Sequence, residues 1–228
     1  MRRIGVLVAV VTSVFLVVGC SKEVTGAARP DPVKAPVVVT EDGYGIRAGF
    51  EDAPAEVEIY TEPQCSHCAD LQQDFGDELA HYIATGQIAV TYRPLTFFDA
   101  DADGYSARVV NALFEAVSPG GGDAGATTGP AFQRFVEELW ASQDPAGVGP
   151  TPDEMADMAR SAGVPEPQVA QIAKGAMAFD AVAASDLNFE FLYEIDPIDT
   201  GTPTVYDLRN DEKLDVYDNE WLSKLTSS

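Results

Sequence analysis

The most regular hydrophobic pattern in the chain predicts a strand that leads into a helix. Residues 56–60 alternate between charged and apolar side chains before ending on Tyr60, as a strand does. After the short segment 61–68, apolar residues recur every three to four positions, as on one face of a helix; they are Leu71, Phe75, Leu79, Tyr82 and Ile83. Gly86 follows as a stop signal, so we expect a helix that starts near Cys65 and ends before Gly86.

Helical patterns also fill most of the region between about residues 100 and 196. The helices expected there lie at 105–117, 131–141, 152–162 and from 165 to about 193. Thr151 and Glu154 have the spacing of a capping box at the start of the third of these helices. So many helices in one stretch predict a helical subdomain.

Loops and a C-terminal hairpin complete the expected elements. The glycine and proline content of residues 119–130 and 144–150 predicts loops. Farther along, residues 204–209 and 213–217 have the pattern of two strands joined by a tight turn. A last helix is expected near residues 219–225. The chain therefore mixes strands and helices, which indicates an α/β fold.

The first 19 residues have the composition of an export signal. Arg2 and Arg3 precede an apolar run over residues 4–18, which is shorter than the about 20 residues that span a bilayer. The run closes on Val17-Val18-Gly19-Cys20, which resembles a bacterial lipobox. This resemblance implies that Cys20 becomes the lipid-modified first residue of the mature chain. Ordinary signal cleavage that leaves a free thiol at Cys20 is the alternative.

These patterns divide the chain into three segments. Residues 1–19 are the expected signal peptide. Residues 20–36 contain three prolines among small and charged residues, which predicts a lipidated N-terminus followed by an extended tether. Residues 37–228 are the expected functional domain, with the helical insertion at about 100–196.

Composition and charge exclude one class of partner. The 228 residues with 46% hydrophobic content fit a chain that is mostly folded. The excess of 37 Asp+Glu over 14 Lys+Arg gives a net charge of -23, which repels phosphate backbones. Nucleic acid is therefore not an expected partner. The acidic surface can serve solubility alone, without selecting partners.

The cysteines indicate redox chemistry. With Cys20 assigned to the anchor, only Cys65 and Cys68 remain, and in an oxidising compartment they pair with each other or stay reactive. A disulfide across so short a loop removes little entropy from the unfolded chain, so stabilisation is a poor reason for it. At a helix start, free amides and the helix dipole lower a cysteine pKa from about 8.5 into the range of roughly 3.5–7.5. We therefore predict that Cys65 is the attacking and leaving sulfur and that Cys68 resolves the mixed disulfide.

His67 lies between the two cysteines, where its imidazole can favour the Cys65 thiolate and make the disulfide more oxidising. A solvent-facing histidine without a role is the alternative. The cysteine pair itself could be an inert bridge or half of a metal site. The sequence contains no second cysteine pair, and its other histidine, His81, stands alone. We therefore expect no zinc site. No other metal and no cofactor is expected either.

The strand, Cys65-Ser66-His67-Cys68 and the helix resemble, in that order, the thioredoxin superfamily and in particular its DsbA-like thiol-disulfide oxidoreductases. A second segment that begins Gly201-Thr202-Pro203 resembles the family's loop in which a cis proline faces the redox pair. The resemblance implies a thioredoxin fold, with a central mixed β-sheet flanked by helices and an inserted helical subdomain. It also implies that Pro203 belongs to the active site and that Thr202 and Pro203 bind substrate. A proline that opens an edge strand is the alternative for Pro203.

Two features depart from the family pattern. Many members have a buried carboxylate six residues before the first cysteine, where this chain has Ile59, with Glu58 and Glu62 beside it. The resemblance therefore assigns no carboxylate to proton shuttling. The dipeptide between the cysteines is Ser-His, rather than the Pro-His or Gly-His commoner among oxidants and isomerases. The redox potential is therefore not ranked by analogy.

Together these features predict a thiol-disulfide oxidoreductase that is lipid-anchored on the extracytoplasmic face of a bacterial cell membrane. We expect a monomer that oxidises thiols of exported proteins and is regenerated by a membrane redox partner. Two alternatives stay open. The same residues can serve a disulfide reductase or isomerase, and the fold can serve a non-catalytic lipoprotein that binds peptides or a partner.

Overall fold

The structure is a computed structural model that describes residues 34–99, 101–119, 125–144 and 147–227. The chain divides into two units, Met1–Pro32 and Val33–Ser228, and the described residues belong to the second. The expected signal peptide, Cys20 and most of the expected tether lie outside the described residues. Within the described ranges, no helix combines the length and the apolar character needed to cross a membrane.

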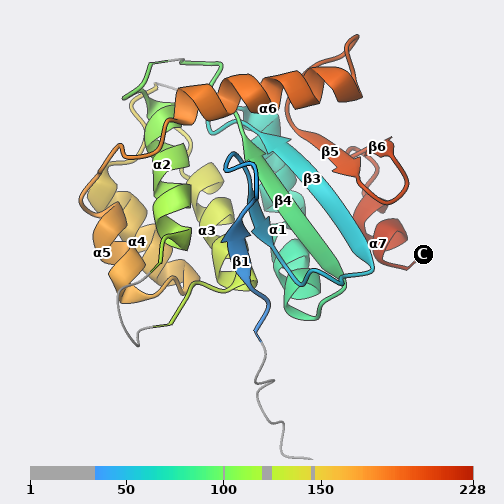
Figure 1. Ribbon diagram of the computed structural model, residues 1–228, viewed down its shortest axis with the longest axis horizontal. Helices are drawn as coiled ribbons and strands as arrows, with labels where there is room; N and C mark the ends of the chain where they lie inside the picture. Colours follow the sequence, from blue (N-terminus) through green and yellow to red (C-terminus); the bar gives the residue numbers. More distant parts are fainter. Residues whose placement is uncertain (1–33, 100, 120–124, 145–146, 228) are drawn as a thin grey trace, which may run out of the picture. The chain divides into compact units, whose positions relative to one another are not determined.

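In the part of the chain that the structure describes, the strands form one mixed sheet of six in the order β1-β2-β4-β3-β5-β6 (Figure 1). Their bounds are β1 Val37–Val39, β2 Ile46–Ala48, β3 Ala55–Thr61, β4 Ile88–Pro94, β5 Thr204–Asp207 and β6 Glu212–Leu214. β3 and β4 are parallel, and every other neighbouring pair is antiparallel. The mixed sheet confirms the architecture that the resemblance implies.

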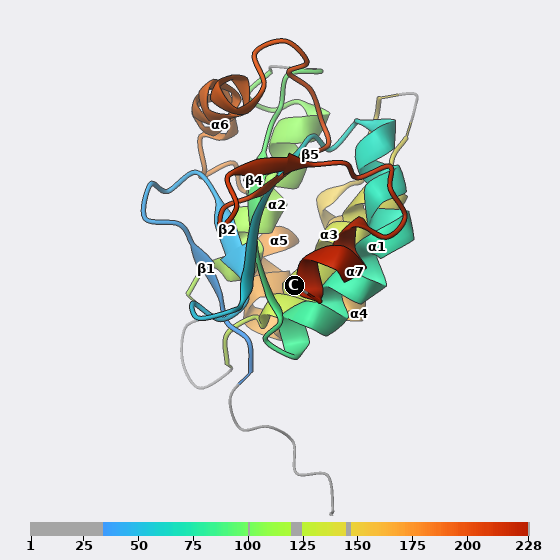
Figure 2. The ribbon, with the colours of Figure 1, turned by 90° about the vertical axis from the view of Figure 1, so that its right-hand side faces the viewer.

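Helices cover both faces of the central strands, so β3 and β4 are buried along most of their length. Successive side chains of a strand point to opposite faces. Ile59 therefore lies in the main core, to which the buried side chains of helix α1 (Ser66–Ala84) also belong. Tyr60 instead joins Leu95 and Leu192 of helix α6 (Ala181–Ile195) in a small separate cluster. Figure 2 shows α1 and α6 on opposite sides of the sheet. Cys65 and Cys68, at the start of α1, belong to the same core cluster as Ile59.

Five helices of the described chain lie between β4 and β5, as expected for a helical insertion. Their bounds are α2 Tyr105–Val117, α3 Gly129–Ala141, α4 Pro152–Ala162, α5 Glu166–Ile172 and α6 Ala181–Ile195. Helices α2 and α4 have the predicted bounds, and α3 begins two residues earlier because Thr128 caps it. The predicted capping box is also present, with Thr151 and Glu154 bonded to each other's backbone N–H groups. Local capping chemistry therefore explains where these helices start.

The prediction of a single helix from residue 165 to about 193 is wrong. The chain forms α5 and α6 instead, separated by residues 173–180. Gly175 has a positive φ of 60°, a left-handed conformation that interrupts a right-handed helix at little cost for glycine. Asp180 then starts α6, because its side chain accepts a hydrogen bond from the Ala183 N–H at 3.0 Å. The break changes the direction of the chain, so that α6 lies on the face of the sheet opposite to α1.

The C-terminal hairpin is present, but its strands are shorter than expected. β5 ends at Asp207, whose carboxylate accepts hydrogen bonds from the N–H groups of Arg209 at 2.9 Å and Asn210 at 3.3 Å. These bonds turn the backbone and end the ladder with β6 early. Helix α7 spans Trp221–Thr226 and packs the Trp221 ring against Phe75 of α1, with centroids 5.4 Å apart. The last element therefore supports the helix that carries the cysteines.

Candidate active site

Cys65 occupies the N-cap position of α1, and residues 62–64 separate it from the end of the central strand β3. Its backbone is extended, with φ -76° and ψ 116°, and its side chain makes no capping hydrogen bond. The residue is 6% exposed, whereas Cys68, one turn into the helix, is fully buried. Both are free thiols in this structure, which therefore describes the reduced pair. The predicted helix start at Cys65 is confirmed, as is the end of the helix before Gly86, whose φ is +73°.

The pKa values of the two cysteines are shifted in opposite directions. A hydrogen bond from the Cys68 thiol is the largest cause that lowers the pKa of Cys65, which falls to about 5 although burial opposes the change. The Thr202 side chain and the backbone N–H groups of Cys68 and His67 lower this pKa further. Burial raises the pKa of Cys68 well above its usual value, and the neighbouring Cys65 adds to this. At neutral pH the reduced site therefore holds a thiolate at Cys65 and a thiol at Cys68.

His67 reaches toward solvent. Its side chain is 62% exposed, with Nδ1 3.5 Å from a carboxylate oxygen of Asp70 and the ring edge-on to Tyr217 at 6.3 Å between centroids. The contribution of His67 to the low pKa of Cys65 comes from its backbone N–H. A role of the imidazole in catalysis therefore stays a prediction.

The loop before β5 brings a distant segment to the redox pair. The Cys65 Sγ lies 3.2 Å from the carbonyl oxygen of Thr202, although the two residues are 137 positions apart. The Thr202–Pro203 peptide bond is cis, which is the arrangement that the resemblance implies. β5 pairs with β3 on one side and β6 on the other, so Pro203 does not open an edge strand. The structure thus brings together Cys65, Cys68, Thr202 and Pro203.

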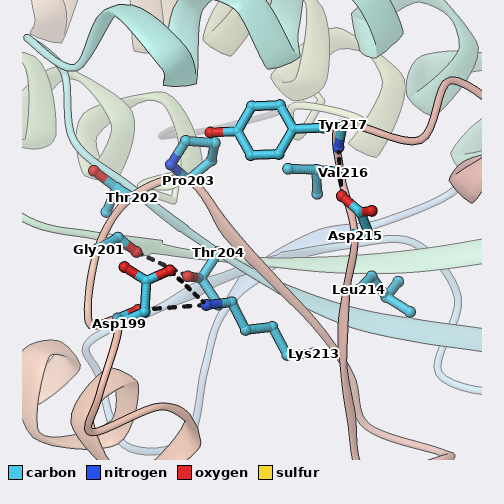
Figure 3. Close-up of a pocket in the computed structure, with 10 residues that line it drawn as sticks. All are labelled: Asp199, Gly201, Thr202, Pro203, Thr204, Lys213, Leu214, Asp215, Val216 and Tyr217. Carbon is cyan, nitrogen blue, oxygen red and sulfur yellow. Dashed lines mark hydrogen bonds and ion pairs between the residues drawn. The ribbon is translucent and has the colours of Figure 1, made fainter.

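A cavity of about 420 Å³ opens beside this loop. It is lined by Asp199, Gly201, Thr202, Pro203, Thr204, Lys213, Leu214, Asp215, Val216 and Tyr217 (Figure 3). Figure 3 shows the Tyr217 ring extending toward Pro203, while the Lys213 ammonium is held near Asp199 on the opposite wall. The walls are apolar near Pro203 and charged farther away. Such a cavity can accept a side chain of a peptide that lies along residues 201–204.

Two polar residues of the helical insertion hold the segment in front of Cys65. The Gln143 side-chain amide donates to the carbonyl oxygens of Pro63 and Cys65, both at 2.8 Å. The Ser106 hydroxyl donates to Glu62 at 2.5 Å and accepts from the Gln64 amide at 3.0 Å. Sequence patterns did not reveal these contacts, because the partners lie 42 to 80 positions apart along the chain. The insertion therefore contributes to the site itself.

Comparisons with known proteins were made on sequence and on structure. A family model that describes thioredoxin matches residues 41–189. The serine/threonine-protein kinase PknE of Mycobacterium tuberculosis is 26% identical over 187 residues, which are 79% of this chain and 31% of that protein. The chain thus spans about a third of the length of the curated relatives it matches.

Solved structures show the same fold. The MdbA protein from Corynebacterium diphtheriae, a thiol-disulfide oxidoreductase, superimposes with a TM-score of 0.65 at 22% identity, covering 86% of this chain and 95% of that one. Reduced DsbA from Mycobacterium tuberculosis gives a TM-score of 0.55 at 19% identity, covering 81% and 98%. The fold of these residues is therefore the DsbA-like variant of the thioredoxin fold, with its helical insertion.

Proposed function

The chain belongs to the thioredoxin family, and from this premise we propose that it is a thiol-disulfide oxidoreductase of the cell envelope that uses Cys65 and Cys68 as its redox pair. One observation carries the proposal. Cys65 is a low-pKa sulfur at a helix start, in contact with the buried thiol of Cys68 and 3.2 Å from the carbonyl oxygen before cis Pro203. A reactive thiolate, a resolving thiol and a backbone segment that can pair with substrate are the parts that disulfide exchange needs.

The favoured direction is oxidation of a substrate dithiol. A substrate thiolate attacks Cys65 in the Cys65–Cys68 disulfide, the bond between the two cysteines breaks, and Cys68 leaves and takes up a proton. A second substrate thiolate then attacks the substrate sulfur of the mixed disulfide and expels Cys65 as a thiolate. The substrate loses two electrons and gains a disulfide, and the enzyme pair is reduced. The low pKa of Cys65 favours this direction, because a stabilised thiolate is a good leaving group and stabilises the reduced pair.

Thr202 and Pro203 are the proposed substrate-binding residues. An extended peptide that lies beside this segment places its cysteine at Cys65, since the Thr202 carbonyl oxygen is 3.2 Å from the Cys65 sulfur. The cavity next to Pro203 then receives a neighbouring side chain of the peptide. His67, exposed at the rim with Tyr217, is the proposed group that modulates the redox potential.

The proposed location is the extracytoplasmic face of a bacterial membrane. The support is the sequence pattern of residues 1–36, with a signal peptide, a lipid on Cys20 and a proline-containing tether. The proposed substrates are exported proteins with thiols, and a membrane redox partner accepts two electrons to re-form the Cys65–Cys68 disulfide. We propose that the protein acts as a monomer.

Two measurements test this function. Equilibration with glutathione buffers gives the reduction potential, which we expect near the about -120 mV of a strong oxidant rather than the about -270 mV of a thioredoxin-like reductant. Oxidation of a reduced two-cysteine peptide gives the turnover, with the Cys65→Ser, Cys68→Ser double variant as the control. A reduction potential near that of a thioredoxin-like reductant would mean that the protein reduces its substrates rather than oxidising them. Equal peptide oxidation by the wild-type protein and the double variant overturns the catalytic assignment and favours a binding role.

A further inference from the structure

A tight turn over residues 62–65 leads from β3 to α1 and carries Cys65 as its last residue. The Cys65 N–H donates a hydrogen bond to the Glu62 carbonyl oxygen at 3.0 Å, which closes this 62–65 turn. Pro63 occupies its second position, which proline favours because its ring fixes φ. The closing bond uses the carbonyl of the first residue, so the carbonyl of the buried Pro63 needs a donor from another segment.

Gln143 of the helical insertion provides that donor. Its side-chain amide donates to the carbonyl oxygens of Pro63 and Cys65, both at 2.8 Å. A side-chain amide has two N–H groups, so each carbonyl oxygen can accept one of them. The two bonds hold the peptide groups that follow Pro63 and Cys65, and the Cα atom of Cys65 lies between these groups. One side chain therefore fixes the backbone on both sides of the reactive cysteine.

The backbone of Gln143 is itself held at the end of α3. Its N–H donates to the Trp140 carbonyl oxygen at 3.3 Å. The preceding residue, Ser142, donates from its N–H to the Glu138 carbonyl oxygen at 3.1 Å and from its hydroxyl to the Leu139 carbonyl oxygen at 2.7 Å. These bonds pair carbonyl groups of the last turn of α3. The Gln143 side chain therefore extends from a well-anchored helix end.

Helix α3 is in turn attached to α1, the helix that the 62–65 turn precedes. The side-chain amide of Gln133 on α3 donates to Oε1 of Gln72 on α1 at 2.7 Å, and both residues are buried. Gly76 of α1 allows a close approach of α3, because a Cβ atom at this position would lie 2.8 Å from the Glu137 carboxyl group. Gln143 therefore connects the 62–65 turn to a helix that is packed on α1.

Disulfide exchange depends on where the 62–65 turn places the Cys65 sulfur. This sulfur lies 3.2 Å from the Thr202 carbonyl oxygen, on the segment proposed to bind substrate. The Cys65 side chain makes no capping hydrogen bond, so its direction depends on the backbone that carries it. Exchange requires the attacking, central and leaving sulfurs to lie in line, and a misplacement of about 1 Å can cost about a hundredfold in rate.

We propose that Gln143 is a positioning residue that holds Cys65 in line for disulfide exchange with a bound substrate. The inference rests on the proposed function. Gln143 acts on the rate of the chemical step, because its amide binds the 62–65 turn and not the proposed substrate-binding segment of Thr202 and Pro203. The pKa of Cys65 is lowered mainly by the Cys68 thiol, which a change at Gln143 leaves in place.

The reduced protein, which is the state described here, allows this step to be measured with a two-cysteine peptide in its disulfide form. The Cys65 thiolate attacks one peptide sulfur, the peptide disulfide breaks, and the other peptide sulfur leaves and takes a proton from solvent. Cys68 then gives up its proton, attacks Cys65 and expels the first peptide sulfur, which receives that proton. Two electrons pass from the cysteine pair to the peptide, and the Cys65–Cys68 disulfide forms.

Single-turnover rates at increasing peptide concentration test the proposal, because they separate the maximal rate from the half-saturating concentration. Gln143→Met keeps nearly the length and volume of the side chain and removes both N–H donors. We expect it to lower the maximal rate at least about tenfold, with an unchanged half-saturating concentration. The matched control is Gln171→Met, which should react like the wild-type protein, because Gln171 is an exposed glutamine of the insertion that bonds to Lys174.

Iodoacetamide alkylation in a Cys20→Ser background gives the second readout, because this small reagent needs no alignment with a bound peptide. We expect the alkylation midpoint of Gln143→Met to stay near 5. Gln143→Asn keeps the amide on a side chain that is one CH₂ group shorter and cannot reach both carbonyls, so we expect an intermediate maximal rate. Thermal unfolding shows which variants are folded at the assay temperature, and Gln143→Asn decides if Gln143→Met is not folded.

Three results would overturn the role of Gln143. They are a wild-type maximal rate in the folded variants, a change confined to the half-saturating concentration, and a loss of rate that is matched by a shift of the alkylation midpoint toward 9.0. In each case the wild-type protein still reacts with the peptide, so the proposed function stands. A wild-type protein that does not react with the peptide at all overturns the proposed function as well.

Discussion

Replacing Cys68 with alanine is expected to raise the pKa of Cys65 by about one to two units. The largest cause of the low pKa is the hydrogen bond that the Cys68 thiol donates to the Cys65 sulfur. A hydrogen bond to a charged group contributes about 1.5–3 kcal/mol, and one pKa unit corresponds to about 1.36 kcal/mol. The pKa of Cys65 is about 5 with this bond present, so loss of the bond moves it to about 6–7.

The assay is the rate of iodoacetamide alkylation as a function of pH, in a Cys20→Ser background so that Cys65 is the only thiol of the Cys68→Ala variant. The midpoint of the profile is the readout rather than the absolute rate, because the intrinsic nucleophilicity of a thiolate falls with its pKa. Cys68→Ser is the matched control. Its hydroxyl can still donate a hydrogen bond, so we expect its midpoint between those of the wild-type protein and Cys68→Ala.

Two results would refute this reasoning. A midpoint that stays near 5 in Cys68→Ala would mean that the thiol of Cys68 does not stabilise the thiolate and that the helix start alone suffices. A wild-type midpoint near the usual cysteine value of 9.0 would mean that Cys65 is not held as a thiolate at all.

Three further predictions concern stability. Asn188→Ala should cost about 1–3 kcal/mol in chemical denaturation, because it leaves the carbonyl oxygens of Tyr44 and Pro94 without the bonds that join α6 to the sheet; an unchanged midpoint would contradict this. Phe132→Ala removes a fully buried ring of α3 and should cost about 3–5 kcal/mol without moving the alkylation midpoint of Cys65. The folded pKa of Cys65, about 5, lies below its ordinary 9.0, so its contribution to the stability of the reduced protein is complete above about pH 9 and is lost as pH falls toward 5. Thermal unfolding of the reduced protein should therefore depend less on pH between these values in Cys65→Ser, and equal pH dependence would count against the thiolate.

Local patterns predicted those elements whose signals lie within one stretch of sequence. The helix that follows β3, the capping box of Thr151 and Glu154, and the bounds of α2 are all set by neighbouring residues, and the structure confirms them. β1 and β2 have three residues each, too few for a periodic pattern to show. β4 is buried along its whole length, so it has no alternation to recognise. The apolar pattern continues through Gly175, although the helix is broken there. The break depends on the left-handed backbone conformation of Gly175, which the pattern does not show.

The chemistry of the site was likewise predictable only in part. The spacing of Cys65 and Cys68 pointed to the redox pair, and the resemblance of the segment around Pro203 to the family's loop pointed to the residues that the structure brings beside it. The main cause of the low pKa of Cys65, the thiol of Cys68, depends on how the two side chains are oriented and not on their spacing. The hydrogen bond that the Glu62 carboxyl accepts from a side chain comes from Ser106, 44 positions away on α2. Contacts of this kind arise from tertiary packing, which local patterns do not encode.

The central claim is that Cys65 is the sulfur that forms the bond to substrate. A two-cysteine peptide in its disulfide form, mixed with Cys68→Ser and quenched with acid, allows the adduct to be mapped by mass spectrometry. The account predicts an adduct on Cys65 and almost none on Cys68 in the matched Cys65→Ser variant, because Cys68 is fully buried and its pKa is raised. An adduct missing from Cys68→Ser, or one equally abundant in Cys65→Ser, would contradict it.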